Sequence, residues 1–227
     1  MAFSLSVDIH TPPTMRPETV RRIVEYAHST AQLLGFAWVA PVIELGQMEI
    51  LEALSTLHEE TAEISDAVRY ARDMLYDSVI GPDFPSEENH QQISPSYAIG
   101  FSAKTGRGCS ILHFVFVKYP PEVVLHKPKL AVGWHLSAVI YEHSAHRISP
   151  TNFVQCHLRN VTLFRQVKRR FPFLQVCVDD EGEYWRSQNL DRLLDHIDTH
   201  ERLLAAVFGA LQDGGMDVEV INLDLDE

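Results

Sequence analysis

Hydrophobic and polar residues alternate over residues 3–10, and this period of two predicts a strand with one buried face. From Pro17 to Gly35 the apolar residues instead recur every three or four positions, which predicts an amphipathic helix that ends at the glycine. Residues 36–45 are apolar on both faces and predict another strand. Because proline cannot donate a hydrogen bond to a neighbouring strand, Pro41 places this strand at a sheet edge or marks a bulge.

Residues 47–79 contain no glycine or proline and keep helical spacing, which predicts one long amphipathic helix or two helices with a break. Residues 81–96 are polar, rich in proline and without periodicity, so we expect a loop or linker there. A β-hairpin follows, with its turn at residues 105–108, and residues 130–143 alternate as a further strand of the same sheet.

The last third of the chain is predicted to contain a helix over 150–170, a short buried strand over 173–178 and a final helix over 190–211. Helices that alternate with strands around one long hairpin predict an α+β fold. We expect a mixed, mainly antiparallel sheet covered by amphipathic helices. The whole chain, 1–227, is predicted to form a single α+β domain, and a domain boundary, if there is one, is expected within 81–96.

Charge and cysteine content exclude several classes of partner. The formal net charge is −12, which repels phosphate groups, so we expect neither a nucleic acid nor an anionic membrane surface as a partner. The three cysteines, Cys109, Cys156 and Cys177, are far apart and form no C-x-x-C pair, which argues against a disulfide framework and favours a reducing cytoplasm. No stretch approaches the roughly 18 apolar residues that span a bilayer.

The sequence CVDDEGEYW, residues 177–185, places acidic and aromatic residues where a predicted strand ends and a helix begins. Ligands often bind at the carboxyl ends of strands, and carboxylates there can hold a hard cation. The candidates are Asp179, Asp180 and Glu181 as catalytic or cation-binding carboxylates, Gly182 as a turn residue with positive φ, and Tyr184 and Trp185 as an apolar wall. The alternative is a solvated turn whose acids favour the following helix dipole.

The order of predicted elements here is a helix with a buried histidine near its start, a strand that runs into D-E-G-x-Y-W, and a further helix. This order resembles a segment of uncharacterised bacterial proteins. The resemblance covers roughly residues 150–212. It gives Asp180–Trp185 the character of a family motif, but these proteins have no assigned activity, so it implies no function.

Histidines are the second group of candidate site residues. His157 falls within the apolar stripe of the helix over 150–170 and is predicted to be buried, and His113 and His135 lie on neighbouring predicted strands. His143 and His146 are three residues apart and could share a divalent metal ion with a distant acid if the segment turns helically. The alternative for each is a hydrogen-bonded core histidine or a polar surface residue.

Two functional hypotheses follow. The first is a cytoplasmic, non-catalytic binding or accessory protein whose acidic surface meets a protein partner or a small molecule. The second is a metal-assisted hydrolase at the Asp179–Trp185 loop, with a divalent metal ion held by His157 or by His143 and His146. The hydrolase requires a histidine nitrogen close to Asp179, Asp180 or Glu181, whereas the binding protein requires solvent-exposed acids and an exposed apolar patch elsewhere. The sequence does not indicate an oligomeric state.

Overall fold

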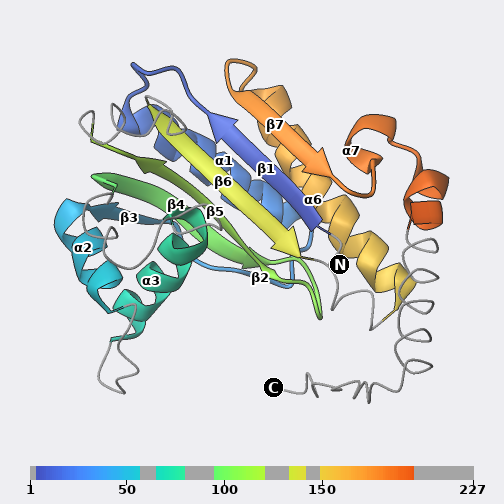
Figure 1. The fold of residues 1–227 in the computed structure, drawn as a ribbon, viewed down its shortest axis with the longest axis horizontal. Helices are drawn as coiled ribbons and strands as arrows, with labels where there is room; N and C mark the ends of the chain where they lie inside the picture. Colours follow the sequence, from blue (N-terminus) through green and yellow to red (C-terminus); the bar gives the residue numbers. More distant parts are fainter. Residues whose placement is uncertain (1–3, 57–64, 80–94, 121–132, 142–148, 197–227) are drawn as a thin grey trace, which may run out of the picture. The chain divides into compact units, whose positions relative to one another are not determined.

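The protein has an α+β fold built on a seven-stranded, mainly antiparallel sheet, as the sequence predicts (Figure 1). The computed structural model describes residues 4–56, 65–79, 95–120, 133–141 and 149–196. Two compact units divide at Asp180: the larger contains residues 4–179, and the smaller contains residues 180–196 of the described chain. Residues 80–94 lie outside the described residues, so the predicted single domain with a boundary within 81–96 stays a prediction.

The sheet has the strand order β2-β4-β5-β6-β1-β7, and β3 pairs with β4 beside β2. The strands are β1 (Ser4–His10), β2 (Trp38–Val39), β3 (Ile43–Gly46), β4 (Tyr97–Lys104), β5 (Ile111–Lys118), β6 (Trp134–Tyr141) and β7 (Gln175–Asp180). The N-terminal strand β1 therefore lies in the interior of the sheet, between two strands that follow it by more than a hundred residues in the chain.

The strand predicted over residues 36–45 is two short strands, because Pro41 interrupts the pairing at this sheet edge. β2 and β3 both run antiparallel to β4, and Ala40 between them donates its amide to the carbonyl of Ser102 at 2.9 Å. The amide of Ser102 donates instead to the hydroxyl of Tyr70 at 2.8 Å. The predicted edge position of Pro41 is thus confirmed, and a tyrosine hydroxyl replaces the hydrogen bond that a continuous strand would provide.

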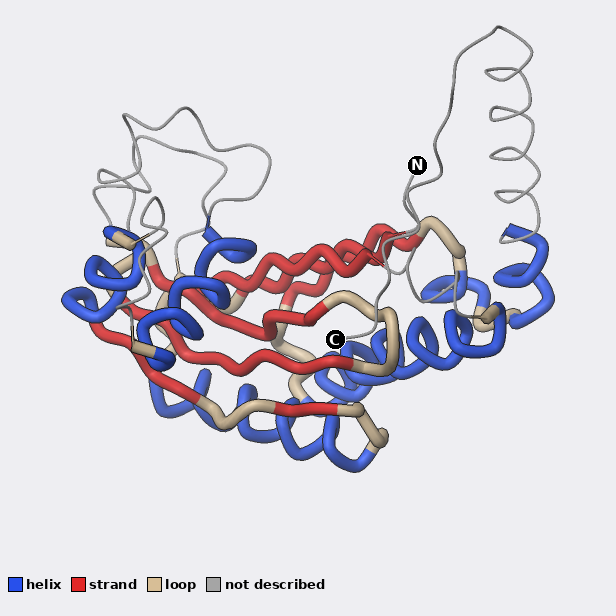
Figure 2. The backbone as a smooth tube through the Cα atoms, turned by 90° about the horizontal axis from the view of Figure 1, so that it is seen from below, coloured by secondary structure: helices blue, strands red, loops and turns tan. Residues whose placement is uncertain are grey.

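Helices cover both faces of the sheet (Figure 2). On one face α1 (Pro17–Leu33) packs against α6 (Pro150–Arg170), and on the other α2 (Gln47–Ser55) packs against α3 (Asp66–Val79). The stretch predicted as one long helix or two over 47–79 therefore contains two helices, with residues 57–64 outside the described chain. Ser149 caps α6 by accepting a hydrogen bond from the Asn152 amide at 3.0 Å, and Gly35, with φ of 71°, follows the C-terminus of α1.

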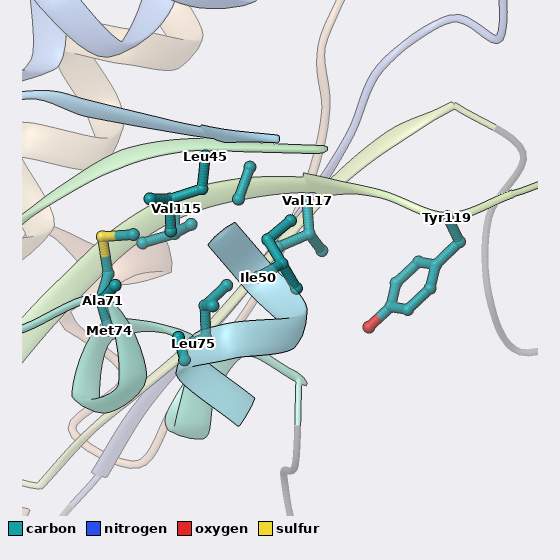
Figure 3. Packing of buried hydrophobic residues seen from close by; sticks show 10 residues of the cluster. Leu45, Ile50, Ala71, Met74, Leu75, Val115, Val117 and Tyr119 are labelled. Atoms are coloured by element: carbon teal, nitrogen blue, oxygen red, sulfur yellow. The ribbon is translucent and has the colours of Figure 1, made fainter. Parts of the chain in front are cut away.

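Alternate residues of the central strands supply two separate hydrophobic cores. On the α1–α6 face Phe114 of β5 stacks against Phe101 at 5.4 Å and against Phe164 at 5.8 Å. The next residue, Val115, points to the opposite face and packs with Ile50 and the other members of a cluster beneath α2 and α3 (Figure 3). This cluster comprises Leu45, Ile50, Ala53, Ala71, Met74, Leu75, Ala98, Val115, Val117 and Tyr119. The sheet is thus buried on both faces where α2 and α3 cover it.

The strand predicted as buried over 173–178 is instead a half-exposed strand at the edge of the sheet. β7 begins at Gln175, and its residues alternate between exposed and half-buried positions. Cys177 is exposed, and Phe173 just before the strand is 43% exposed. The apolar residues predict a buried strand, but within the described chain β7 has a strand neighbour on one side only, so the prediction is wrong.

Cys109 and Cys156 form a disulfide, which corrects the expectation that the three cysteines form none. Their Cα atoms lie 6.5 Å apart although 47 positions separate them in the sequence. The turn after β4 packs against α6 and brings them together: Thr105 donates from its hydroxyl to the side-chain oxygen of Asn160 at 2.8 Å. Sequence spacing could not reveal this pair, because the contact depends on how the hairpin and the helix dock.

Candidate functional site

The candidate loop after β7 is built around the carboxylate of Asp180. One carboxylate oxygen accepts the amide hydrogen of Gly182 at 2.9 Å, and the other accepts that of Trp185 at 2.6 Å. The Asp180 carbonyl also accepts the amide of Glu183 at 2.9 Å, which closes the turn before α7 (Tyr184–Ser187). Backbone amides therefore bind both oxygens of this carboxylate, an arrangement typical of a structural turn.

The left-handed residue of this turn is Glu183, with φ of 54°, and the predicted positive φ at Gly182 is wrong. Gly182 is buried in the turn but does not have a positive φ. The Asp180 carboxylate holds the amide of Gly182, and the left-handed backbone conformation falls one residue later, at Glu183, directly before α7. The sequence pattern D-E-G suggested the glycine because a residue without Cβ adopts this conformation at the lowest cost.

The remaining acidic residues of the loop are exposed, and the aromatic residues are half-buried. Asp179, Glu181 and Glu183 are solvent-exposed, whereas Tyr184 and Trp185 are partly covered. Glu183 lies 3.5 Å from the guanidinium of Arg192 and 3.8 Å from the Nε2 atom of His196. These are exposed pairs, and pairs of this kind contribute little to stability.

The predicted metal-ligating histidines are distributed differently. His157 is fully buried on α6, as predicted, and its ring stacks on Phe153 with centroids 5.9 Å apart and planes 8° apart. His143 and His146 lie outside the described residues. Across the described ranges, no three His, Cys, Asp or Glu side chains are grouped so that they could hold a metal ion. The structure thus brings Asp180, Gly182 and Trp185 together, and the metal-binding and catalytic roles stay predictions.

Residues 190–196 begin the predicted final helix and expose two leucines. Asn189 starts this helix, because its side-chain oxygen accepts the amide of Asp191 at 2.9 Å. Leu193 is fully buried, whereas Leu190 is 42% and Leu194 is 37% exposed. Leu190 and Leu194 are one helical turn apart and share a face. The rest of the predicted helix, including the whole of 197–211, is outside the described chain.

A second polar cluster, which the sequence reasoning missed as a group, lies on β1 and β6. Leu5, Val7 and Ile9 of β1 are fully buried, so the intervening polar residues face the other side of the sheet. The register pairs Asp8 with Ser137 and His10 with His135. Figure 1 shows α2 and α3 on this face of the sheet, and α3 also contacts β6.

The geometry of this cluster places one carboxylate and two imidazoles together. The Nε2 atom of His135 lies 3.8 Å from a carboxylate oxygen of Asp8, and the rings of His10 and His135 stack with centroids 5.0 Å apart. The signal in the sequence was D-x-H in one strand and H-x-S in the other. Only the antiparallel register, which no spacing in the sequence reports, places the two patterns opposite each other.

Comparison with known proteins gives no family: no protein-family model, no curated protein and no solved structure matches the chain. The resemblance of residues 150–212 to uncharacterised bacterial proteins stays a prediction.

Replacing Asp180 with alanine should destabilise the loop by about 1–3 kcal/mol, because two backbone amides lose a charged acceptor. Hydrogen exchange at the amides of Gly182 and Trp185 should accelerate accordingly. The matched control is Asp179→Ala, one residue away and exposed, which should leave both exchange rates unchanged. Equal effects of the two substitutions would contradict the structural role of Asp180.

Proposed function

We propose that this is a non-catalytic binding or accessory protein that meets a protein partner through the acidic unit that begins at Asp180. The binding surface comprises Leu190 and Leu194 together with the acidic residues Glu183, Asp191 and Asp195, and we call it the acidic leucine surface. The observation that carries the proposal is the exposure of two leucines on one helical face, 42% and 37%, among exposed carboxylates. Asp179 and Glu181 are exposed, as the binding hypothesis requires, whereas the Asp180 carboxylate is held by backbone amides.

The chemistry of the surface defines the partner. Fully burying an exposed leucine contributes about 1.5–3 kcal/mol, and Leu190 and Leu194 gain part of this because they are 42% and 37% exposed, so the partner offers an apolar groove or helix face. The flanking carboxylates and the net charge of −12 favour a partner with lysine or arginine around that groove. The same charge supports the expectation of neither a nucleic acid nor a membrane surface as partner.

The loop geometry supports binding over metal-assisted hydrolysis. Both oxygens of Asp180 already accept backbone amides, so this carboxylate is held as part of the turn. His196 of this unit approaches Glu183, with its Nε2 atom 3.8 Å from a carboxylate oxygen. Neither observation depends on whether a metal ion is present.

The expected cytoplasmic location rested on the cysteine pattern, and the disulfide changes that argument. Disulfides persist mainly in oxidising compartments, so the bond between Cys109 and Cys156 removes the support that the cysteine count gave to a reducing one. None of the described helices is long and apolar enough to span a membrane. The proposal therefore specifies the partner and its surface and does not depend on the compartment.

A synthetic helical peptide with a leucine face flanked by lysines should bind the acidic leucine surface, with an affinity that decreases as salt increases. The double substitution Leu190→Ser/Leu194→Ser should weaken binding about 100-fold, since each leucine contributes roughly one factor of ten. Calorimetric titration of the full chain measures both effects.

The matched control is Leu33→Ser, because Leu33 is an exposed leucine, at 88%, on α1 in the larger unit. It should leave the affinity unchanged. A scrambled peptide of the same composition keeps the charge but loses the leucine face, and it should bind only weakly. If the scrambled peptide bound equally well, or if the double substitution had no effect, charge alone would explain the interaction and the proposed surface would be wrong.

A further inference from the structure

Three titratable side chains form a row across β1 and β6 on the sheet face away from α1 and α6. Asp8 is 44% exposed and lies 3.8 Å from His135, whose side chain is only 15% exposed. His10 stacks on His135, with the two ring planes 15° from parallel. The row therefore combines one carboxylate with two imidazoles that can each take up a proton.

The row accommodates one proton on its imidazoles better than two. A single positive charge lies next to the carboxylate of Asp8, whereas a second proton would place two positive rings against each other with centroids 5.0 Å apart. The Nδ1 atoms of both His10 and His135 are buried, and neither has a hydrogen-bond partner among the described residues. A proton taken up by either buried nitrogen would find no hydrogen-bond acceptor to compensate for the hydration that the charged ring lacks in the folded protein.

The row lies where β1 ends and β6 begins. The amide of Trp134 donates to the hydroxyl of Thr11 at 3.1 Å, and the amide of Thr11 donates to the carbonyl of Trp134 at 3.0 Å. The indole nitrogen of Trp134 donates to the carbonyl of Met15 at 3.2 Å, which links this strand end to the segment before α1. Repulsion within the stack would therefore act on the last pairs of the β1–β6 ladder.

We propose that Asp8, His135 and His10 form a proton-operated switch, in which uptake of a second proton on acidification separates the stacked rings and loosens the adjoining ends of β1 and β6. At neutral pH His10 is neutral and the strand ends stay paired. In acid the pairs formed by His10 with His135 and by Thr11 with Trp134 open first.

The electrostatics of the row support this order of events. Burial, followed by the positive charge of His135, lowers the pKa of His10 from its usual 6.5, and Asp8 opposes this only in part. The neighbouring imidazole of His135 lowers the pKa of Asp8, and the Ser137 hydroxyl adds to the effect. On the next strand, β5, Val117 is the register neighbour of His135. Lys118 of that strand lies 5.9 Å from the Trp134 ring, whose strand position faces the α1–α6 side.

The direction of the pH effect follows from these shifts. Because the pKa of His10 is lower in the folded than in the unfolded chain, the unfolded chain binds the proton more tightly. The contribution of His10 is complete above pH 6.5 and is lost as the pH falls toward its folded-state value. The contribution of Asp8 is lost only at lower pH, below the usual carboxyl pKa of 3.8. The switch thus operates below pH 6.5, as the pH falls toward the folded-state pKa of His10.

The test combines NMR titration of the imidazole rings with amide hydrogen exchange on the full chain. The ring of His10 should titrate with a midpoint below 6.5. Protection factors at the amides of Thr11 and Trp134 should fall about tenfold between about pH 7.5 and about pH 5. The variant His10→Gln keeps a polar side chain without the proton, and it should show constant protection over this range.

The control variant His196→Gln removes a partly exposed histidine of the smaller unit and should retain the acid-induced loss of protection. Two results would overturn the proposal: an acid response that persists in His10→Gln, or a wild-type protein whose protection at Thr11 and Trp134 does not change while His10 titrates. The second result needs no variant, so the proposal can be tested even if His10→Gln does not fold.

Discussion

Replacing both Cys109 and Cys156 with alanine should lower the free energy of unfolding by about 4 kcal/mol. The disulfide closes a loop across a sequence separation of 47, and this cross-link restricts the unfolded chain more than the folded one. Both cysteines are buried, and the turn that contains Cys109 is tied to α6 by other contacts. We therefore expect the variant to fold to the same structure, with a lower midpoint in urea denaturation.

The control for this prediction is Cys177→Ala, because Cys177 is exposed and outside the disulfide. Its stability should equal that of the wild type. The protein unfolded without reductant should also offer one thiol to alkylation, since two of its three cysteines are bonded. Three alkylated thiols, or an unchanged midpoint in the double variant, would show that the bond is absent in solution.

Most elements of the fold could be predicted because each depends on a local pattern. Alternation over residues 3–10 corresponds to β1, and the helix predicted to begin at Pro17 is α1, which does begin there. Burial of His157 followed from helical spacing alone, because the position of a residue in an apolar stripe decides which way it faces. Each of these properties is determined within a single helix or strand.

The errors concern properties that depend on neighbouring elements. The run from Phe173 to Val178 is apolar enough for a buried strand, but β7 lies at the edge of the described sheet and is half-exposed. The pairing of Cys109 with Cys156 depends on the docking of a hairpin against a helix. Neither a strand order nor a docking contact leaves a periodic signal in the sequence.

The candidate site illustrates the same limit. The position of Asp180 at a strand end could be predicted from the sequence, but the hydrogen bonds from two backbone amides to its carboxylate could not. It noted His135 without identifying Asp8 and His10 as its neighbours, because the register of β1 and β6 joins residues more than 120 positions apart. The most informative polar cluster of the larger unit therefore came from strand register.

Replacing Gly100 with alanine should destabilise the protein by about 3 kcal/mol, because the added methyl group has no space between β4 and β5. Gly100 pairs with Ile43 on one side and with Val115 on the other, at the centre of three strands. A Cβ atom there would lie 2.6 Å from both the carbonyl oxygen of Phe114 and the Cα atom of Val115. Both are backbone atoms, so relief requires a shift of the β4–β5 ladder itself.

Gly46→Ala provides the control, because a Cβ at Gly46 would approach only the carboxylate of Glu49, at 3.4 Å, which a flexible side chain can move. This substitution should cost less than about 1 kcal/mol. The ladder shift caused by Gly100→Ala should also disturb the hydrogen bond between the Ser102 amide and the Tyr70 hydroxyl, two residues along β4. Urea denaturation measures the first effect and hydrogen exchange at Ser102 the second. Equal stability of the two variants would mean that the strands are farther apart at Gly100 than this register requires.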